Sequence, residues 1–88
     1  MTTEFLKSFS KDIDKIKIES VLSDIESAIL NAEESLNQTE IRNLKKLKGF
    51  QDAYRIRIGN YRIGIFIDGE KVTFARVIHR KDIYKEFP

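Results

Sequence analysis

The fold of this chain is decided by residues 54–79, which read YRIRIGNYRIGIFIDGEKVTFARVIH. Its first five residues alternate apolar and charged side chains, the pattern of a half-buried β-strand. Gly59 and Asn60 then form a two-residue link with glycine first, which suits a type II′ hairpin turn, and Asp68 and Gly69 suit a type I′ turn. The stretch therefore predicts an antiparallel meander with strands at about residues 54–58, 61–67 and 71–78.

The two turns also predict the register of the strands. A turn centred on Gly59 and Asn60 places Ile58 opposite Tyr61, Arg57 opposite Arg62, Ile56 opposite Ile63 and Arg55 opposite Gly64. A turn centred on Asp68 and Gly69 places Ile67 opposite Glu70, Ile65 opposite Val72, Gly64 opposite Thr73 and Ile63 opposite Phe74. One face is then apolar and available to helices, and the other collects Arg55, Arg57, Arg62, Gly64, Thr73 and Ala75.

The arginine-rich face is the first indication of function. Like charges directly opposite on a sheet destabilise it by a few tenths of a kcal/mol up to ~1 kcal/mol, and Arg57 is predicted to face Arg62. Three guanidiniums around the small residues Gly64, Thr73 and Ala75 would form a phosphate-binding depression, because arginine presents a planar donor fork that matches phosphate oxygens. The alternative is three solvated arginines on an exposed antiparallel sheet.

Upstream of the meander, the apolar period is mainly helical. A short strand is expected at residues 3–6, and apolar stripes predict helices at about residues 8–16 and 19–32, with Ser8 or Ser10 capping the first. A short link at Lys17 makes them an antiparallel hairpin, and a polar loop follows at residues 35–39. Apolar residues at 41, 44 and 47 predict a helical turn that carries Lys45, Lys46 and Lys48. The expected class is α+β, an N-terminal helical hairpin packed on a small, mainly antiparallel sheet.

Length and composition predict one globular domain, residues 1–88. Hydrophobic residues make up 41% of the chain and charged residues 34%, which excludes a disordered tail. Without cysteine, neither a disulfide framework nor a thiolate zinc site can hold the fold, and a cytoplasmic location is expected. The first twenty residues contain no apolar run of signal-peptide or membrane-span length, so we expect neither secretion by that route nor membrane insertion.

The formal net charge of +2 conceals an uneven distribution. Residues 1–44 hold five basic and nine acidic side chains, a net charge of −4, whereas residues 45–88 hold eleven basic and five acidic side chains, a net charge of +6. A basic half favours a polyanionic partner, of which nucleic acid is the commonest. The alternative is a solvated face that serves solubility only.

Three segments together resemble a known family. These segments are Leu47-Lys48-Gly49, the run from Tyr54 to Gly64, and the tail that reads RVIHRKDIY from Arg76 to Tyr84. In this order they resemble the RelE branch of the RelE/ParE toxin superfamily, and the similarity extends over the whole chain. It implies a RelE-like fold and a toxin of a type II toxin–antitoxin pair. It also implies a ribosome-dependent endoribonuclease, an mRNA interferase in which the 2′-OH of the message attacks the adjacent phosphate.

The resemblance also implies which residues act. The family's basic residues on the first meander strand correspond to Arg55 and Arg57, its next-strand arginine to Arg62, and its C-terminal arginine and tyrosine to Arg80 and Tyr84. Preorganised guanidiniums stabilise the charge that builds on the phosphate, and Tyr84 would stack on or orient a base. Attraction to RNA backbone is expected from Lys45, Lys46, Lys48 and Lys81. No metal or other cofactor is implied.

The chain departs from the best-known RelE sequences at two positions, where Arg55 and Arg57 replace lysines. Arginine does not lose its proton in proteins, so another group is needed as a general base. His79 is the one side chain of the tail whose ordinary pKa lies near neutrality. We therefore hypothesise that His79 assists proton transfer, so that His79→Gln would strongly reduce cleavage.

Two other functions remain open. One is that of a ParE-like toxin, which shares the fold but inhibits DNA gyrase. The other is that of a non-catalytic basic module that docks acidic protein or structured RNA. The expected partners of the RelE-like toxin are a cognate antitoxin, which is often encoded next to the toxin, together with the ribosome and mRNA, and no membrane.

Overall fold

A computed structural model describes all residues from Met1 to Pro88. Its sheet has five strands in the order β1-β5-β4-β3-β2, with β1 parallel to β5 and the other pairs antiparallel. The elements are β1 (Thr2–Phe5), α1 (Lys7–Lys15), α2 (Glu19–Glu34), the 3₁₀ helix η1 (Gln38–Glu40), β2 (Leu44–Lys46), β3 (Ala53–Ile58), β4 (Tyr61–Asp68), β5 (Lys71–His79) and α3 (Ile83–Glu86). None of the helices combines the length and the apolar character needed to span a membrane. The predicted α+β class, the N-terminal strand, the two long helices and the meander are confirmed.

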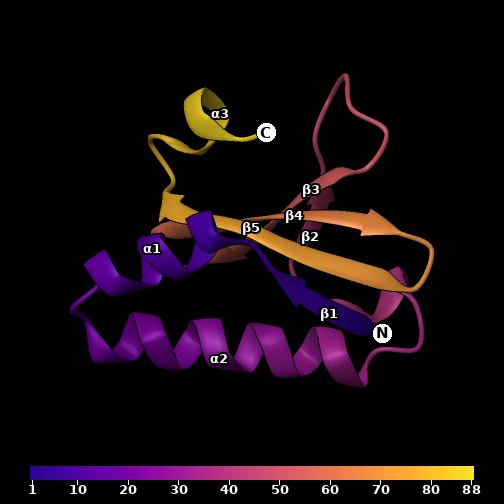
Figure 1. Ribbon diagram of the computed structural model, residues 1–88, viewed down its shortest axis with the longest axis horizontal. Helices are drawn as coiled ribbons and strands as arrows, with labels where there is room; N and C mark the ends of the chain where they lie inside the picture. Colours follow the sequence, from indigo (N-terminus) through magenta and orange to yellow (C-terminus); the bar gives the residue numbers. More distant parts are fainter.

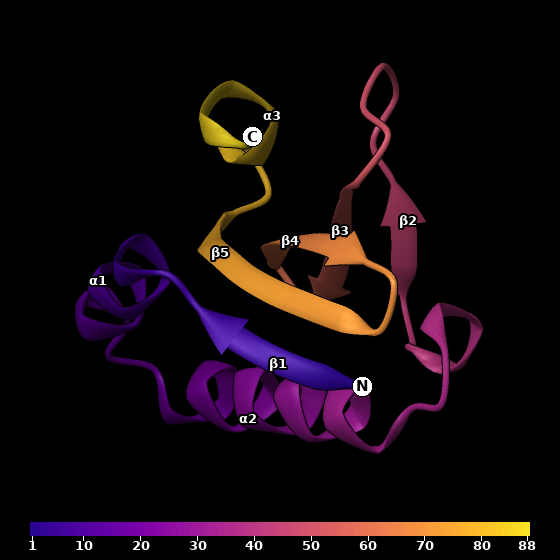
Figure 2. The same ribbon diagram turned by 45° about the vertical axis from the view of Figure 1, so that its right-hand side comes forward.

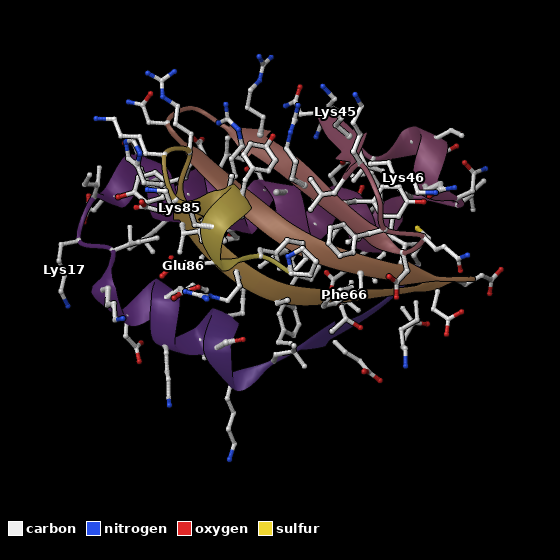
Figure 3. The ribbon with its side chains drawn as sticks, turned by 90° about the horizontal axis from the view of Figure 1, so that it is seen from above. Lys17, Lys45, Lys46, Phe66, Lys85 and Glu86 are labelled. Atoms are coloured by element: carbon white, nitrogen blue, oxygen red, sulfur yellow. The ribbon has the colours of Figure 1, made fainter.

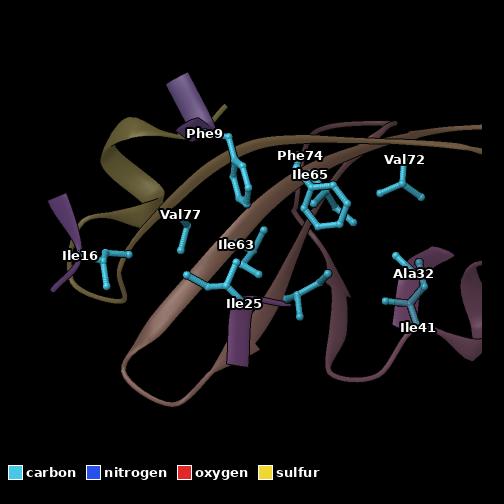
Figure 4. Close-up of a cluster of buried hydrophobic side chains, with 11 residues drawn as sticks. Phe9, Ile16, Ile25, Ala32, Ile41, Ile63, Ile65, Val72, Phe74 and Val77 are labelled. Carbon is cyan, nitrogen blue, oxygen red and sulfur yellow. The ribbon is translucent and has the colours of Figure 1, made fainter. Parts of the chain in front are cut away.

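The helices divide between the two faces of the sheet. Figures 1 and 2 show α1 and α2 running in opposite directions, with α2 below the sheet, while α3 and the loop between β2 and β3 rise above it. The main core lies between the sheet and the two long helices (Figure 4). Its buried members are Phe9, Ile16, Ile25, Ala32, Ile41, Ile56, Ile63, Ile65, Val72, Phe74 and Val77.

The first helix also covers the edge of β5 beyond the end of β1. Leu6 donates its backbone N–H to the carbonyl of Phe74 over 3.0 Å, and the Ser8 hydroxyl donates to the carbonyl of Ala75 over 2.6 Å. These contacts satisfy backbone groups that an open sheet edge would leave without partners. The predicted capping role of Ser8 or Ser10 is wrong, because Leu6 occupies the N-cap position without a side-chain hydrogen bond.

The register predicted around Gly59 is confirmed, and the register predicted around Gly69 is wrong. Asp68 pairs with Lys71, so Gly69 is the first central turn residue, and its φ of +59° is the left-handed value that a type II′ turn requires there. A β-bulge then shifts the pairing, since Ile65 lies opposite Phe74 but Gly64 lies opposite Arg76. Because of the bulge, Val72, Phe74 and Val77 of β5 all face the main core, although they are spaced by two and then three residues.

Residues 44–46 form strand β2, so the helical turn predicted there is wrong. Leu44 pairs with Ile56 and Lys45 with Arg55, and the Arg57 N–H donates to the carbonyl of Asn43 over 3.2 Å. The spacing of three suggests a single helical face, but in the strand Leu44 packs against the main core and Leu47 is buried on the other side of the sheet. Pairing with the otherwise open edge of β3 favours the strand.

Candidate functional site

Basic side chains gather on the sheet face that points away from α1 and α2. Arg57 lies directly opposite Arg62 on the neighbouring strand, as predicted, and Lys45 lies opposite Arg55. Because paired residues point to the same side of a sheet, this face carries two cross-strand pairs of like charge. We call Arg55, Arg57, Arg62 and Arg80 the arginine cluster.

Backbone carbonyls, and not carboxylates, hold two of these guanidiniums. One terminal nitrogen of Arg62 donates to the carbonyls of Gly59 and Tyr61 over 2.8 and 2.9 Å. Arg55 donates to the carbonyl of Asn43 over 3.0 Å, and its buried Nε–H has no partner. No member of the arginine cluster belongs to a salt bridge. Its positive charge is therefore left without a neutralising partner.

The pKa of Arg62 reflects the same crowding of positive charge. Burial lowers the pKa of Arg62, and the neighbouring guanidinium of Arg55 lowers it further. Arg57 and Arg80 act in the same direction, whereas Tyr84 raises it. The positive charges of Arg55, Arg57 and Arg80 thus act together on Arg62, which lies directly opposite Arg57 on the sheet. An anion placed there would relieve the repulsion.

The C-terminal tail supplies Arg80 and Tyr84 to this position. The Arg80 N–H donates to the carbonyl of Asn60 over 2.8 Å, which ties the tail to the turn between β3 and β4. Beyond it, Ile83 and Phe87 are buried in a second apolar cluster on this face, while the side chain of Tyr84 is 65% exposed. Figure 3 looks down on this face and shows α3, with Lys85 and Glu86, lying across the sheet.

The floor predicted from Gly64, Thr73 and Ala75 is not open. A methyl group on Gly64 would stand 2.6 Å from Cγ of Phe87, and Ala75 is buried in the same apolar cluster as Phe87. These two small residues make room for the tail that follows α3, and the predicted phosphate depression at this place is wrong. The second cluster consists of Leu47, Ala53, Ala75, Ile83 and Phe87.

The open depression lies beside the arginine cluster instead. A pocket of about 580 Å³ extends from Arg57, Arg62 and Arg80 across to α2. Arg42 also lines it, a residue that no sequence motif singles out. No periodic pattern connects Arg42 with the cluster, because its position depends on how β2 pairs with β3. The remaining lining residues are Asp24, Ser27, Ala28, Asn31, Asn43, Ile56, Ile58 and Gly59.

His79 does not lie with the arginine cluster. It pairs with Tyr61, whose side chain packs against the main core, so the register directs His79 toward the face opposite Arg57 and Arg62. The two rings lie edge to face with centroids 5.7 Å apart, and His79 Nδ1 accepts a hydrogen bond from the Lys81 N–H over 3.2 Å. The β-bulge contributes to this result, since it changes which residues of β5 share the arginine face.

The predicted lysines lie in two places. Lys45 pairs with Arg55, and together with Lys46 and Lys48 it lines a second depression next to Tyr84. Lys81 is exposed at the start of the tail, and the structure does not bring it into the arginine cluster. Only Lys45 thus extends the cluster directly across the sheet.

An ion pair between Asp12 of α1 and Arg76 of β5 lies next to α3, and the sequence pattern did not predict it. Asp12 is 6% exposed and accepts hydrogen bonds from Nε and a terminal nitrogen of Arg76 over 2.6 and 3.1 Å, and from the Val77 N–H over 3.0 Å. The bond to Asp12 raises the pKa of Arg76, which also lies 3.9 Å from Glu86 on α3. One signal was present in the sequence: Asp12 follows Phe9 by three residues and so lies on the apolar stripe of its helix.

The fold is that of a toxin family. A family model for the ParE toxin of type II toxin–antitoxin systems matches residues 3–84, and the chain belongs to this RelE/ParE superfamily of toxins. Toxin RelE3 of Methanocaldococcus jannaschii is 38% identical over an alignment of 94 positions, which covers both chains completely.

Solved structures agree with this assignment. The toxin–antitoxin complex RelB–RelE from Methanococcus jannaschii contains a chain with 40% identity and a TM-score of 0.78, and the match covers 97% of this chain and 99% of that one. A chain of the RelBE2 complex from Mycobacterium tuberculosis has 27% identity and a TM-score of 0.64, with coverage of 90% and 96%. The resemblance to RelE toxins noted from the sequence is confirmed.

Proposed function

We propose that this toxin is a ribosome-dependent endoribonuclease that cuts mRNA and thereby stops translation. The observation that carries the proposal is the arginine cluster, in which guanidiniums crowd around Arg62 without a carboxylate partner. Such a cluster is costly to the fold unless an anion binds there, and a phosphodiester supplies that anion. The buried Nε–H of Arg55, which has no partner, is a further donor in this region.

In the proposed reaction the RNA supplies its own nucleophile. The 2′-oxygen attacks the adjacent phosphorus, the bond from phosphorus to the 5′-oxygen breaks, and the products are a 2′,3′-cyclic phosphate and a 5′-hydroxyl end. Arg57 and Arg62 stabilise the charge on the phosphate oxygens, with Arg55 holding the backbone and Arg80 reaching the leaving-group side. The 2′-hydroxyl loses a proton and the 5′-oxygen gains one.

Tyr84 is the group that we assign to this proton exchange, together with water. Among the side chains that influence Arg62 it is the one that is not a guanidinium, and its hydroxyl can both donate and accept a hydrogen bond. Its exposed ring is also available to stack on a base. His79 stands on the other face, so the proposal gives it a structural role at the end of β5.

The partners follow from the size of the chain and from its relatives. A chain of 88 residues offers little surface for positioning a long message, and a ribosome would supply that positioning. The two related solved structures are complexes of a toxin with an antitoxin. We therefore propose that a cognate antitoxin binds this chain and holds it inactive in the cytoplasm.

The test is translation in a cell extract with sequencing of the mRNA ends. The expected result is loss of protein synthesis together with new 5′-hydroxyl ends and 2′,3′-cyclic phosphate ends. The double variant Arg57→Gln/Arg62→Gln should lose both effects, whereas Lys11→Gln/Lys17→Gln, which removes the same charge from the helical side, should retain them. An unchanged rate of cleavage in the arginine variant would overturn the assignment of the site.

A ParE-like gyrase inhibitor is the second candidate, because the matching family model is that of the ParE toxin. It predicts that translation and message stay intact while DNA supercoiling by gyrase fails. A basic binding module predicts RNA binding without new ends. The same extract, supplemented with a supercoiling assay, separates the three functions.

A further inference from the structure

The short helix α3 is held to the rest of the molecule by few contacts. The backbone hydrogen bonds of residues 83–87 all stay within the tail, so none of them joins α3 to the sheet. The side chains of Ile83 and Phe87 are buried in the second apolar cluster. The one polar link between α3 and the sheet is the ion pair of Glu86 with Arg76, over 3.9 Å.

Apolar burial constrains the orientation of such a helix only weakly. A helix of one turn has little stability of its own, and the attraction between apolar side chains has no preferred direction. An ion pair between a carboxylate and the planar fork of an arginine is directional by comparison. The contact of Glu86 with Arg76 is therefore suited to fix how α3 lies on the sheet.

Arg76 is itself held in place from the opposite side. Asp12 of α1 accepts hydrogen bonds from Nε and a terminal nitrogen of Arg76 over 2.6 and 3.1 Å, and it accepts a third from the Val77 N–H over 3.0 Å. Asp12 is almost completely buried, so water screens this pair little. The guanidinium therefore meets Glu86 from a fixed position.

Glu86 and Tyr84 leave α3 on opposite sides. Two residues along an α-helix turn through about 200°, so a contact that holds one of these side chains also sets the direction of the other. Figure 3 shows Glu86 on the side of α3 toward α1. Tyr84 lies on the other side, where it acts on Arg62.

A purely structural role accounts less well for the pair of Asp12 with Arg76. Replacement of a buried ion pair by apolar residues of similar volume is often neutral or stabilising, so the burial of such a pair is poor evidence that it serves stability. The Val77 N–H needs an acceptor, but a neutral oxygen would satisfy it. The charge of the pair has a use where Arg76 meets Glu86.

We propose that Asp12 and Arg76 are positioning residues that act through Glu86. Together the three side chains, which we call the carboxylate–arginine bridge, hold α3 in the orientation that places Tyr84 beside Arg62. This inference rests on the proposed function, in which Tyr84 takes part in proton exchange. Because a misplacement of about 1 Å in an active site can cost about a hundredfold in rate, even a half-exposed ion pair influences cleavage in this way.

A fluorine label on tyrosine tests the position of Tyr84 without any RNA. The chain has three tyrosines, and Tyr84→Phe identifies the signal of Tyr84 after incorporation of 3-fluorotyrosine. Glu86→Gln, which removes the charge and keeps the size, should shift or broaden that signal and leave the other two in place. Lys85→Gln is the matched control, because it removes a charge next to Tyr84 without breaking an ion pair, and it should have a much smaller effect.

Cleavage on ribosomes is the second measurement. Glu86→Gln should lower kcat about two- to fivefold, the effect expected for a half-exposed ion pair, and should leave KM unchanged because the arginine cluster is intact. Asp12→Asn/Arg76→Met removes the whole bridge but keeps an amide oxygen for the Val77 N–H, and it should lower kcat about tenfold or more. If thermal unfolding shows that the double variant does not fold, Glu86→Gln decides alone, since its side chain is 51% exposed.

The outcomes distinguish the carboxylate–arginine bridge from the proposed function. A displaced Tyr84 signal in Glu86→Gln, with no cleavage by the parent protein, would support the bridge and contradict the endoribonuclease. An active parent protein with an unchanged kcat in Glu86→Gln, or with an unchanged Tyr84 signal, would overturn the bridge and leave the endoribonuclease in place. An equal displacement of the signal by Lys85→Gln, or a rise in KM at unchanged kcat, would also overturn the positioning of Tyr84.

Discussion

At the residue scale, Arg57 and Arg62 face each other at a direct cost to the stability of the sheet. We predict that Arg57→Gln raises the free energy of unfolding by a few tenths of a kcal/mol up to ~1 kcal/mol, because it removes a cross-strand repulsion. Urea denaturation measures this change, and it should shrink in 1 M salt, where charges are screened. Lys17→Gln, at an exposed lysine outside the sheet, is the control and should have no such effect.

This prediction tests whether the arginine cluster lowers the stability of the fold while it supports activity. The same Arg57→Gln protein should lose cleavage activity while becoming more stable, the opposite of what loss of a structural residue produces. A loss of stability in the variant would mean that Arg57 has a structural role that its exposed position does not indicate.

His79 gives a second prediction at this scale. The sequence led to the expectation that His79→Gln would strongly reduce cleavage, but the register turns the residue away from the arginine cluster. We now predict that the variant retains cleavage within a few fold of the parent protein in the extract assay. Tyr84→Phe, which removes the hydroxyl and keeps the ring, is the informative comparison and should be severely impaired.

The result for His79→Gln is decisive in either direction. A strong loss of activity, with unchanged thermal unfolding, would return His79 to a role in proton transfer and would require the tail to change position when RNA binds. The tyrosine variant would then be expected to keep most of its activity.

At the element scale, the docking of α3 depends on one glycine. A Cβ on Gly64 would stand 2.6 to 2.8 Å from three ring atoms of Phe87, a contact that forces the ring to move. We predict that Gly64→Ala destabilises the protein by about 1–3 kcal/mol and loosens α3, because overpacking displaces the ring from its buried site. Hydrogen exchange at the Phe87 N–H, which donates to the carbonyl of Ile83 over 2.8 Å, measures the loosening.

Gly69→Ala is the matched control for this prediction. Gly69 has open space around it but a φ of +59°, so alanine strains the backbone there without touching α3. It should lower the free energy of unfolding and leave the protection of Phe87 unchanged relative to global stability. Equal protection of Phe87 in both variants would contradict the role given to Gly64.

At the scale of the whole molecule, the two faces of the sheet differ in charge as well as in packing. The acidic N-terminal half provides the helices below the sheet (Figure 1), and the basic half provides the arginine cluster on the opposite face, together with Lys45. The small net charge of +2 is thus the sum of two opposed surfaces. Long-range attraction of RNA depends on the charge of the basic face and not on the net charge of the whole chain.

This arrangement predicts a steep salt dependence. If the arginine cluster neutralises about four phosphates, the logarithm of the affinity for a single RNA strand that carries more than four phosphates and is blocked by 2′-O-methyl groups should fall against the logarithm of salt concentration with a slope near −3. Arg57→Gln/Arg62→Gln should reduce the steepness by about 1.4, and Lys11→Gln/Lys17→Gln should not. Binding that does not depend on salt would contradict the phosphate site.

The strands of the meander, the two long helices and the opposition of Arg57 and Arg62 follow from the sequence alone. These features depend on local properties, namely the period of apolar residues and the turn at Gly59, which fixes the register of its own hairpin. The resemblance of the ordered basic segments to RelE toxins was equally available from the sequence, and the comparisons confirm it.

Which residues meet at the site depends on tertiary packing. Whether residues 44–46 form a strand depends on the open edge of β3, and the face on which His79 lies depends on a bulge that packing selects. Distant segments of the chain meet where Phe87 covers Gly64 and where Phe50 and Tyr84 line one depression. Such contacts form because buried apolar area is gained across the whole sheet, and no local period encodes them.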